Sequence, residues 1–232
     1  MRIFNCTDEK ALALKGASIV KLELSKKPAL LLCAATGGSP LPLYKELVLE
    51  SQKKTMLFDQ LRVIPLDEWI GLDHPSSSCD AYLHQHLLDP LHIKKKNYFP
   101  FNTEAKDIQQ ECERIRQQLN QEGPIDLCIL GLGANGHLGL NEPAGVLQPH
   151  CHIAQLAPES RNHRMLKSAT IKPTKGLTLG MQDILASKRI LMIISGSGKA
   201  QTTRAFFKKK IDSQLPASYL WRHDNVDCLV LQ

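Results

Sequence analysis

The chain has 232 residues, 43% of them hydrophobic and 22% charged, which is enough apolar material for a buried core and excludes a disordered or collagen-like chain. The formal net charge of +6 comes from scattered basic residues, so we expect no nucleic-acid partner. Seven widely spaced cysteines without a Cys-x-x-Cys pair argue against a disulfide framework or a zinc ribbon. No apolar run reaches the roughly 18 residues of a membrane span, and the first residues lack a secretory signal pattern. We therefore expect a cytoplasmic protein without a membrane partner.

Short apolar runs bounded by Gly or Pro predict buried strands over residues 29–34, 61–66, 125–130, 190–194 and 226–231. Longer amphipathic stretches predict helices over residues 8–24, 41–54, 77–88, 104–119 and 200–211. Strands that alternate with helices are typical of an α/β fold with a mostly parallel sheet and helices on both faces. No repeat or low-complexity linker interrupts the pattern, so we expect a single domain over residues 1–232. Ligands of such folds bind at the carboxyl ends of the strands.

The first predicted strand is followed by Thr36, Gly37, Gly38, Ser39 and Pro40, and the next predicted helix starts at once. Glycines let the backbone approach an oxyanion, the two hydroxyls can donate hydrogen bonds, and a helix N-terminus attracts negative charge. These residues are a candidate phosphate site. An ordinary turn in which Ser39 caps the helix and Pro40 occupies its first position fits the loop equally well.

Two adjacent carboxylates, Asp67 and Glu68, follow the second predicted strand and precede Trp69. While the extended geometry persists, only one of them can face the crevice. A carboxylate beside an indole in a partly dry pocket can have a raised pKa and act as a general base. Without further context, a helix cap or a surface acid is the commoner role for such a pair.

The third predicted strand runs into GLGANGHLGLNEP, residues 131–143. The segment contains a G-x-G-x-x-G pattern, but Pro143 follows too soon for the long helix that a dinucleotide site needs. It does place His137 on a glycine-rich loop, with Asn135 before it and Glu142 after it. An imidazole that is held by two such groups is a proton shuttle at neutral pH, and we favour this role over a loop histidine beside a capping Asn.

Residues 157–175 form a polar, basic stretch with Arg161, Arg164 and Lys167. The stretch fits a lid over an anionic ligand or a solvated helix and loop, and both interpretations stay open. The adjacent His150-Cys151-His152 has no third ligand at a usual spacing, so we expect no metal site.

The strand at 190–194 is followed by SGSGKA. This resembles half of a P-loop, but the first glycine and the Mg²⁺-binding hydroxyl are missing, so we expect no nucleotide hydrolysis. Lys199 stands at a helix N-terminus, where the helix dipole repels a cation. A bound phosphate explains a lysine at this position better than a purely structural role does.

Four segments in this order, TGGSP, LDEW, GLGANGHLGLNEP and SGSGKA, resemble the amino-sugar-phosphate deaminase/isomerase family, and the likeness covers nearly the whole chain. Residues 125–148 and the ending PASYLWRHDNVDCLVLQ look closest to the galactosamine-6-phosphate isomerase branch. The resemblance implies an open, modified Rossmann-like α/β fold with a lid over about residues 150–175. It also implies a cofactor-free reaction in which a 2-amino-2-deoxyhexose 6-phosphate is ring-opened, isomerised from aldose to ketose and deaminated.

Carried over by position, Asp67 resembles the base that moves a proton from C2 to C1, and His137 resembles the ring-opening acid and base. Asn135 and Glu142 resemble its supports. The phosphate is expected between residues 37–39 and Lys199, with one cation from the lid; Arg161, Arg164 and Lys167 are all candidates because none aligns cleanly.

Some members have Asp where Asn135 stands, so this site carries one titratable group fewer. The chain ends soon after its last predicted strand, without the longer tail of allosteric, hexameric relatives. We therefore expect no activation by an N-acetyl-amino-sugar phosphate, and the oligomeric state stays open, a homo-oligomer included.

The expected substrate is galactosamine 6-phosphate, giving tagatose 6-phosphate and ammonia, with glucosamine 6-phosphate as the alternative and lactone hydrolysis, as in 6-phosphogluconolactonase, as the third. In lactonases the Asp-Glu pair is usually followed by Arg, whereas Trp69 follows here. A sugar-phosphate-sensing module is disfavoured because it would need neither Asp67 nor His137.

Overall fold

A sheet of six parallel strands forms the centre of the molecule. The computed structural model describes residues 1–54, 56–73, 75–167, 169–196 and 198–231. Across the sheet, the strands follow the order β1 (Arg2–Cys6), β9 (Val226–Leu231), β8 (Ile190–Ile194), β5 (Leu127–Gly131), β2 (Leu31–Ala34) and β3 (Arg62–Pro65). Every neighbouring pair in this sheet is parallel, which confirms the predicted α/β architecture.

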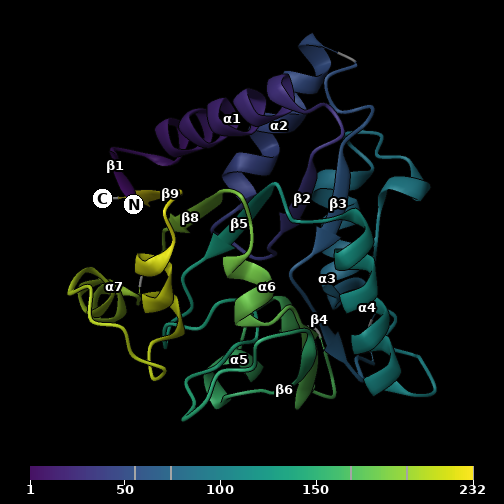
Figure 1. Ribbon diagram of the computed structural model, residues 1–232, viewed down its shortest axis with the longest axis vertical. Helices are drawn as coiled ribbons and strands as arrows, with labels where there is room; N and C mark the ends of the chain where they lie inside the picture. The colour runs from purple at the N-terminus through teal and green to yellow at the C-terminus, as the bar shows by residue number, and fades with distance from the viewer. Residues whose placement is uncertain (55, 74, 168, 197, 232) are drawn as a thin grey trace.

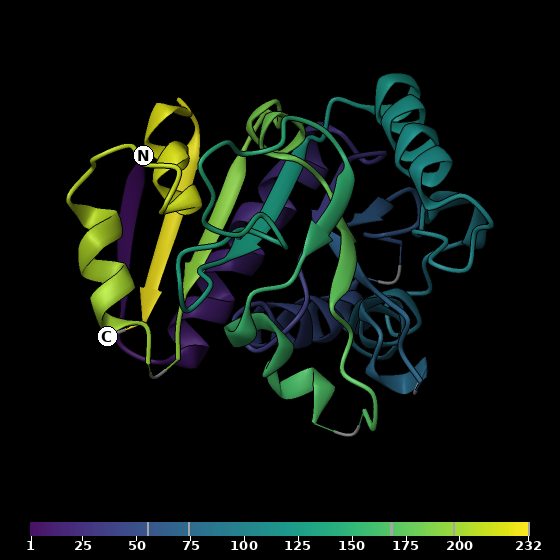
Figure 2. The ribbon, with the colours of Figure 1, turned by 90° about the horizontal axis from the view of Figure 1, so that it is seen from below.

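Helices cover both faces of this sheet because alternate strand residues point to opposite sides. Leu32 and Ala34 pack toward α1 (Glu9–Lys26) and α2 (Leu41–Lys53). Leu31 and Cys33 of the same strand belong to the other core, which is covered by three further helices. These are α4 (Ile108–Glu122), α6 (Met181–Leu185) and α7 (Ala200–Phe207). Figure 2 shows the strands side by side between these layers.

A second, smaller sheet branches from the edge of the first. After β3 the chain passes through Leu66 into β4 (Asp67–Ile70), which pairs antiparallel with β7 (Lys175–Thr178). The third strand, β6 (His152–Gln155), pairs antiparallel with β7. The backbone N–H of Leu66 donates to Ala34, and its carbonyl accepts from the N–H of Leu179. Asp67 therefore lies where the two sheets part.

The predicted helices agree with the structure in place but differ at their ends. The expected helix at 77–88 is split into a turn of 3-10 helix at Pro75–Ser77, α3 (Cys79–Leu83) and a π-helical turn at His84–Leu88. The helix expected from 104 begins at Ile108 because the side chain of Asp107 accepts from two backbone N–H groups and caps it there. The helix expected to reach 211 ends at Phe207. Four strands and two helices were not predicted: β1, β4, β6, β7, α5 (Pro158–Arg161) and α6.

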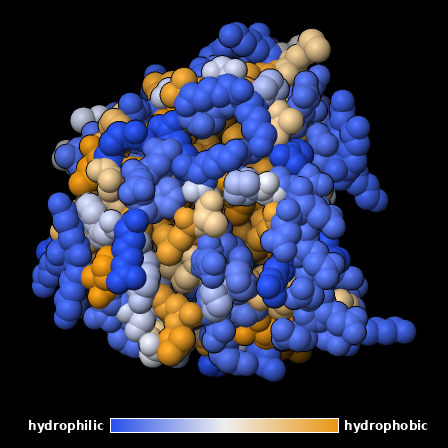
Figure 3. All heavy atoms as spheres, in the orientation of Figure 1, coloured by the Kyte–Doolittle hydropathy of each residue, from blue (hydrophilic) through white to orange (hydrophobic). Residues whose placement is uncertain are grey.

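The two ends of the chain lie next to each other, since β1 and β9 are neighbours in the sheet (Figure 1). The face of the molecule in Figure 3 is mostly hydrophilic, with hydrophobic residues visible in patches between the polar ones. None of the helices in the described part of the chain combines the length and the apolar character of a membrane span.

Candidate active site

A cavity lies at the carboxyl ends of the central strands. From β2 the chain continues outward to β3, whereas from β5 it continues the other way, to β8 and β9. The loops after β2 and β5 therefore diverge and leave a crevice, as is usual where strand order reverses. The cavity has a volume of about 200 Å³, and its wall is formed by Ala35, Thr36, Gly37, Gly38, Ser39, Leu66, Asp67, Trp69, Gly131, Leu132, Gly133, Ala134, His137, Gly139, Leu140, Glu159, Ser160, His163 and Lys199.

Of the adjacent carboxylates Asp67 and Glu68, Asp67 is the one on the cavity wall. It is only 8% exposed, and its Oδ1 accepts from the thiol of Cys79 at 3.6 Å. The hydroxyl of Thr36 donates in turn to that sulfur at 3.4 Å. Burial raises the pKa of Asp67 to about 6, against the opposing effects of Cys79 and His137. At neutral pH the carboxylate is therefore ionised and more basic than an exposed one.

Glu68 has a different task from its neighbour. One of its oxygens accepts from the backbone N–H groups of Trp69, at 2.8 Å, and Cys79, at 2.9 Å. The other accepts from the N–H of Asp80 at 2.7 Å. Glu68 thus ties the first turn of α3 to β4, and it holds Cys79 against Asp67.

Polar side chains contact His137 at its backbone and on the Nδ1 side of its ring. Its backbone N–H donates to the side chain of Asn135 at 3.2 Å, and that amide donates to Glu142 at 2.9 Å. The Nδ1 atom of the imidazole lies 3.4 Å from Oε2 of Glu142 and 3.5 Å from the hydroxyl of Ser160. The ring packs closely on Gly133, where an added Cβ would lie 2.3 Å from the imidazole. Only a glycine at this position leaves room for the ring.

Glu142 stays ionised in this group. Burial raises its pKa, but the contacts with His137, Ser160 and Asn135 outweigh burial and bring the pKa to about 2. A carboxylate beside Nδ1 holds the proton of a neutral imidazole on that nitrogen, so Nε2 remains as a proton acceptor at the cavity wall. Because Ser160 also hydrogen-bonds Glu142, helix α5 takes part in positioning the imidazole.

Positive charge gathers at the other end of the cavity. Lys199, the N-cap residue of α7, donates from Nζ to the hydroxyl of Ser39 at 3.3 Å. Burial and the charge of Arg164 lower the pKa of Lys199. The guanidinium of Arg164 rests on Gly38, where an added Cβ would lie 2.8 Å from a guanidinium nitrogen. Lys199 and Ser39 thus lie on the cavity wall, and Arg164 lies against Gly38 in a neighbouring pocket. Two cations, a hydroxyl and a glycine backbone close to one another are an arrangement suited to a phosphate.

The alternative interpretation of the residues before α2, in which Ser39 caps the helix, is wrong. Pro40, not Ser39, occupies the N-cap position, and no side chain caps this helix. The hydroxyl of Ser39 is instead the partner of Lys199.

The other basic residues of the segment 157–175 lie elsewhere. Arg161 is exposed and donates from Nε to the carbonyl of Leu156, and Lys167 is exposed. None of the three candidate cations is among the described residues of the cavity wall. Arg164 differs from the other two because its guanidinium lies against Gly38, in the loop after β2.

His150 and His152 have other partners. His150 contacts Asp183 at 2.8 Å through Nδ1, and Nδ1 of His152 donates to the carbonyl of His150. Within the described ranges, no group of three or more His, Cys, Asp or Glu residues is arranged to hold a metal ion.

Four polar residues of the described site were not predicted: Cys79, Glu159, Ser160 and His163. They lie 12, 92, 93 and 96 positions after Asp67, in or next to short elements whose sequences show no regular pattern. The basic composition of residues 157–175 is a sequence signal that points to the segment of the last three.

Known proteins resemble this chain over almost its whole length. A protein of Escherichia coli (strain K12) named "Putative deaminase AgaI" is 39% identical over 221 residues, which is 95% of this chain and 88% of that protein. A glucosamine-6-phosphate deaminase of Bacillus pumilus (strain SAFR-032) is 35% identical over 233 residues, 99% of this chain and 97% of that protein.

Solved structures show the same fold. That of a monomeric glucosamine-6-phosphate deaminase matches with a TM-score of 0.94 at 34% identity, over 100% of this chain and 98% of that one. A 6-phosphogluconolactonase from Thermotoga maritima matches with a TM-score of 0.75 at 19% identity, over 99% of this chain and 98% of that one, which is a likeness of fold alone. The family model described as glucosamine-6-phosphate isomerases/6-phosphogluconolactonase matches residues 9–229. The chain therefore belongs to the glucosamine-6-phosphate isomerase/6-phosphogluconolactonase family.

Proposed function

We propose that the chain converts a 2-amino-2-deoxyhexose 6-phosphate to the corresponding ketose 6-phosphate and ammonia, without a cofactor. One observation carries the proposal: a buried, basic carboxylate and a supported imidazole share a cavity with an anion site at its other end. The relatives that are named as glucosamine-6-phosphate deaminases support the same reaction.

In the first step His137 opens the sugar ring. Its Nδ1 side faces Glu142, so Nε2 accepts the proton of the C1 hydroxyl, and a proton passes to the ring oxygen as the bond between C1 and that oxygen breaks. Glu142 stabilises the imidazolium that forms in between. Asn135 and Ser160 keep this carboxylate in place.

In the second step Asp67 takes the proton from C2 and returns it to C1. The electron pair left at C2 forms a double bond to C1 while the π bond of the C1 aldehyde breaks, and the aldehyde oxygen takes a proton from the 2-ammonium group, which gives an enolamine. Protonation at C1 then leaves an iminium group at C2 and a hydroxyl on C1. Water adds to that carbon, and ammonia leaves to give the ketose. A base with a pKa near 6 suits this step, because it is ionised at neutral pH and still accepts a proton readily.

The preferred substrate in this proposal is galactosamine 6-phosphate, which gives tagatose 6-phosphate; glucosamine 6-phosphate, which gives fructose 6-phosphate, is the alternative. The likeness of residues 125–148 and of the chain's ending to the galactosamine branch supports the first. The named relatives support the second. Ammonia release from both sugars, measured in parallel, tests the reaction and identifies the epimer. Hydrolysis of 6-phosphogluconolactone without ammonia release from either sugar would contradict the proposal.

We also propose that residues 150–175 act as a lid. The segment contributes Ser160 and His163 to the cavity wall and places Arg164 on Gly38. It also supplies hydrogen bonds to Glu142 from the hydroxyl of Ser160 and the N–H of Ala157. Closing such a segment over the sugar would bring a cation to the phosphate and complete the support of His137 in one movement.

Replacing Lys199 with Ala is expected to raise KM by about tenfold to a hundredfold and to change kcat little. A charge-assisted hydrogen bond to phosphate is made in the ground state and in the transition state alike, and its loss weakens both. Steady-state kinetics check this, with Lys208→Ala as the control, since Lys208 is exposed at the other end of α7. An unchanged KM would place the anion site elsewhere.

Replacing His137 with Gln is expected to reduce kcat on the natural, ring-closed substrate by about a hundredfold or more. An analogue without the C4 and C5 hydroxyls cannot form a pyranose or a furanose ring, so its turnover should fall much less. The comparison of the two losses is the measurement. Equal losses on both compounds would show that His137 does not act in ring opening.

The acid limb of the pH profile should report on Asp67. Because its pKa is raised to about 6 and the base works in the ionised form, kcat/KM should fall as the pH drops below about 6. Replacing Cys79 with Ala removes the thiol that hydrogen-bonds the carboxylate, so the limb should move to higher pH, whereas Cys79→Ser should restore a donor. An acid limb that is the same in all three proteins would assign it to another group.

A further inference from the structure

His163 is part of the cavity wall. Its Nε2 lies 3.4 Å from the position that a Cβ on Gly37 would take, so this edge of the ring lies against the loop after β2. The ring is also near Trp69, with 6.2 Å between the ring centroids and 39° between the ring planes. Trp69 is two residues from Asp67 on β4. The imidazole thus lies between the anion site and the base.

The hydrogen bonds of His163 fix which nitrogen carries the proton. Nδ1 accepts from the backbone N–H of Met165 at 3.4 Å and caps the short helical turn Arg164–Leu166. The proton of the neutral ring is therefore on Nε2. Burial, and the charges of His137, Arg164 and Lys199, lower the pKa of His163 to about 4, so the ring is neutral at physiological pH. Within the described chain, no acceptor is within hydrogen-bond distance of Nε2.

This donor suits a hydroxyl better than a phosphate. The anion site already has Lys199, Ser39 and Arg164, and nearby cations disfavour the charged form of the imidazole that would add to it. A hydroxyl can accept a hydrogen bond from a neutral N–H at no electrostatic penalty. When C2 lies at Asp67 and the C6 phosphate lies at residues 37–39, His163 faces the part of the sugar between these two positions. In the ring-closed substrate C5 carries the ring oxygen, so the free hydroxyl nearest the phosphate is the one on C4.

We propose that Nε2–H of His163 donates a hydrogen bond to the C4 hydroxyl of the substrate and thereby sets the preference between galactosamine 6-phosphate and glucosamine 6-phosphate. The inference rests on the proposed function, because it takes the positions of C2 and of the phosphate from it. The two sugars differ only in the configuration at C4, so a donor at this place is aligned with one hydroxyl and misaligned with the other. A site discriminates most strongly against an analogue when binding that analogue leaves a buried polar group of the site without a hydrogen-bond partner.

Two substitutions separate the donor from the helix cap. His163→Asn keeps an acceptor near the position of Nδ1 and deletes the Nε2–H. His163→Gln keeps an N–H donor near the position of Nε2 and deletes the cap. The experiment measures kcat/KM of the wild type and both variants on the two sugar phosphates and on the 4-deoxy analogue of the better one. Inhibition by inorganic phosphate serves as a check on the anion site.

The expected result is that His163→Asn moves the ratio of kcat/KM for the two epimers toward one by about fivefold to tenfold, whereas His163→Gln retains most of the wild-type ratio. On the 4-deoxy analogue the wild type and His163→Asn should be nearly equal, because the hydroxyl is absent. Phosphate should inhibit all three proteins at similar concentrations.

An unchanged epimer ratio in His163→Asn would overturn the inference and leave the proposed function intact. Equal losses on both epimers, together with weaker inhibition by phosphate, would assign His163 to the anion site and also overturn it. A wild type that releases ammonia from neither sugar would refute the proposed function, and this inference with it.

Discussion

Replacing Asp67 with Asn is expected to reduce kcat by about a thousandfold and to abolish exchange of the C2 proton with solvent. The amide has the shape of the carboxylate, so it fills the same space between Cys79 and the cavity, but it cannot accept a proton. General-base catalysis contributes on the order of a hundredfold to ten-thousandfold, and the loss should fall within that range. The effect lies in the chemical step, since Asp67 contacts Cys79 whereas Lys199, in the proposed phosphate site, contacts Ser39.

The measurement is loss of the C2 proton signal in deuterated water, followed by nuclear magnetic resonance with substrate and purified protein. Asp224→Asn is the matched control because Asp224 is exposed and distant from the cavity wall. Inhibition by inorganic phosphate should be the same in the wild type and both variants, which would exclude a general disturbance of the site. Exchange that persists in Asp67→Asn would assign proton abstraction to another group.

The strands of the central sheet were predictable because each is a short run of buried apolar residues. The predicted ranges of β8 and β9 agree with the structure residue for residue. Their parallel arrangement follows from the helices between them, and it brings the loops after several strands to one edge. Thr36, Asp67 and His137 could therefore be expected near one another before their distances were known, and all three line the cavity.

The second sheet could not be predicted in the same way. Its strands have four residues each, and β4 consists of Asp67, Glu68, Trp69 and Ile70, which has no alternation of apolar and polar side chains. A strand of this kind depends on partners that are far away in the sequence, in this case β7, more than a hundred residues later. Propensity is a weak guide where tertiary packing decides.

The same reason explains why His163 and Ser160 were missed. Ser160 is on the four-residue helix α5, and His163 precedes a 3-10 turn of three residues. Each acquires its role from a contact with a residue that is distant in the sequence. The sequence showed that the segment is basic. It could not show which of the three cations contacts the loop after β2, because that is decided by the direction of each side chain in the packed segment.

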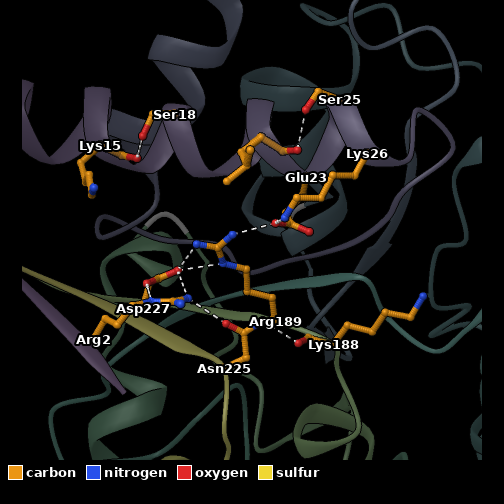
Figure 4. A network of polar contacts seen from close by, with 11 residues as sticks. Arg2, Lys15, Ser18, Glu23, Ser25, Lys26, Lys188, Arg189, Asn225 and Asp227 are labelled. Atoms are coloured by element: carbon orange, nitrogen blue, oxygen red, sulfur yellow. Dashed lines mark hydrogen bonds and ion pairs between the residues drawn. The ribbon is translucent and has the colours of Figure 1, made fainter.

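A buried ion-pair network joins the edge of the central sheet to α1. The side chain of Asp227, on β9, is 1% exposed and accepts from Arg2 on β1 at 2.6 Å and from Nε of Arg189 at 2.8 Å. Arg189 also donates to Glu23 of α1 at 2.7 Å. Figure 4 shows the two guanidinium groups directed at the one carboxylate. The network thus joins β1, β9, the residue that precedes β8, and α1 around the buried carboxylate of Asp227.

Replacing Asp227 with Asn should lower the free energy of unfolding by about 3 kcal/mol at pH 7. Removing one partner of a buried ion pair leaves the other charge unpaired, at a cost of roughly 3–5 kcal/mol, and the half-exposed Arg2 can turn toward water and reduce the loss. Urea denaturation measures it, with Asp224→Asn as the exposed control. A decrease in the free energy of unfolding of less than about 1 kcal/mol, which is typical of exposed ion pairs, would contradict the role of Asp227 as the buried centre of this network.

The pH dependence of this loss provides a second, independent test. Burial raises the pKa of Asp227, but the hydrogen bonds and charges of Arg2 and Arg189 outweigh it, so the pKa lies below its usual value of 3.8. A lowered folded-state pKa contributes stability that is present above the unfolded-state value and is lost as the pH falls through the folded-state value. The gap between the wild type and Asp227→Asn should therefore be constant from pH 7 to about 5 and narrow below about 4. A difference in free energy of unfolding that does not narrow would mean that the variant is destabilised by altered packing and not by the lost charge.

The double variant Asp227→Leu with Arg189→Met separates these two causes, because it removes both buried charges. It should recover part of the lost stability only if the unpaired charge is the cause.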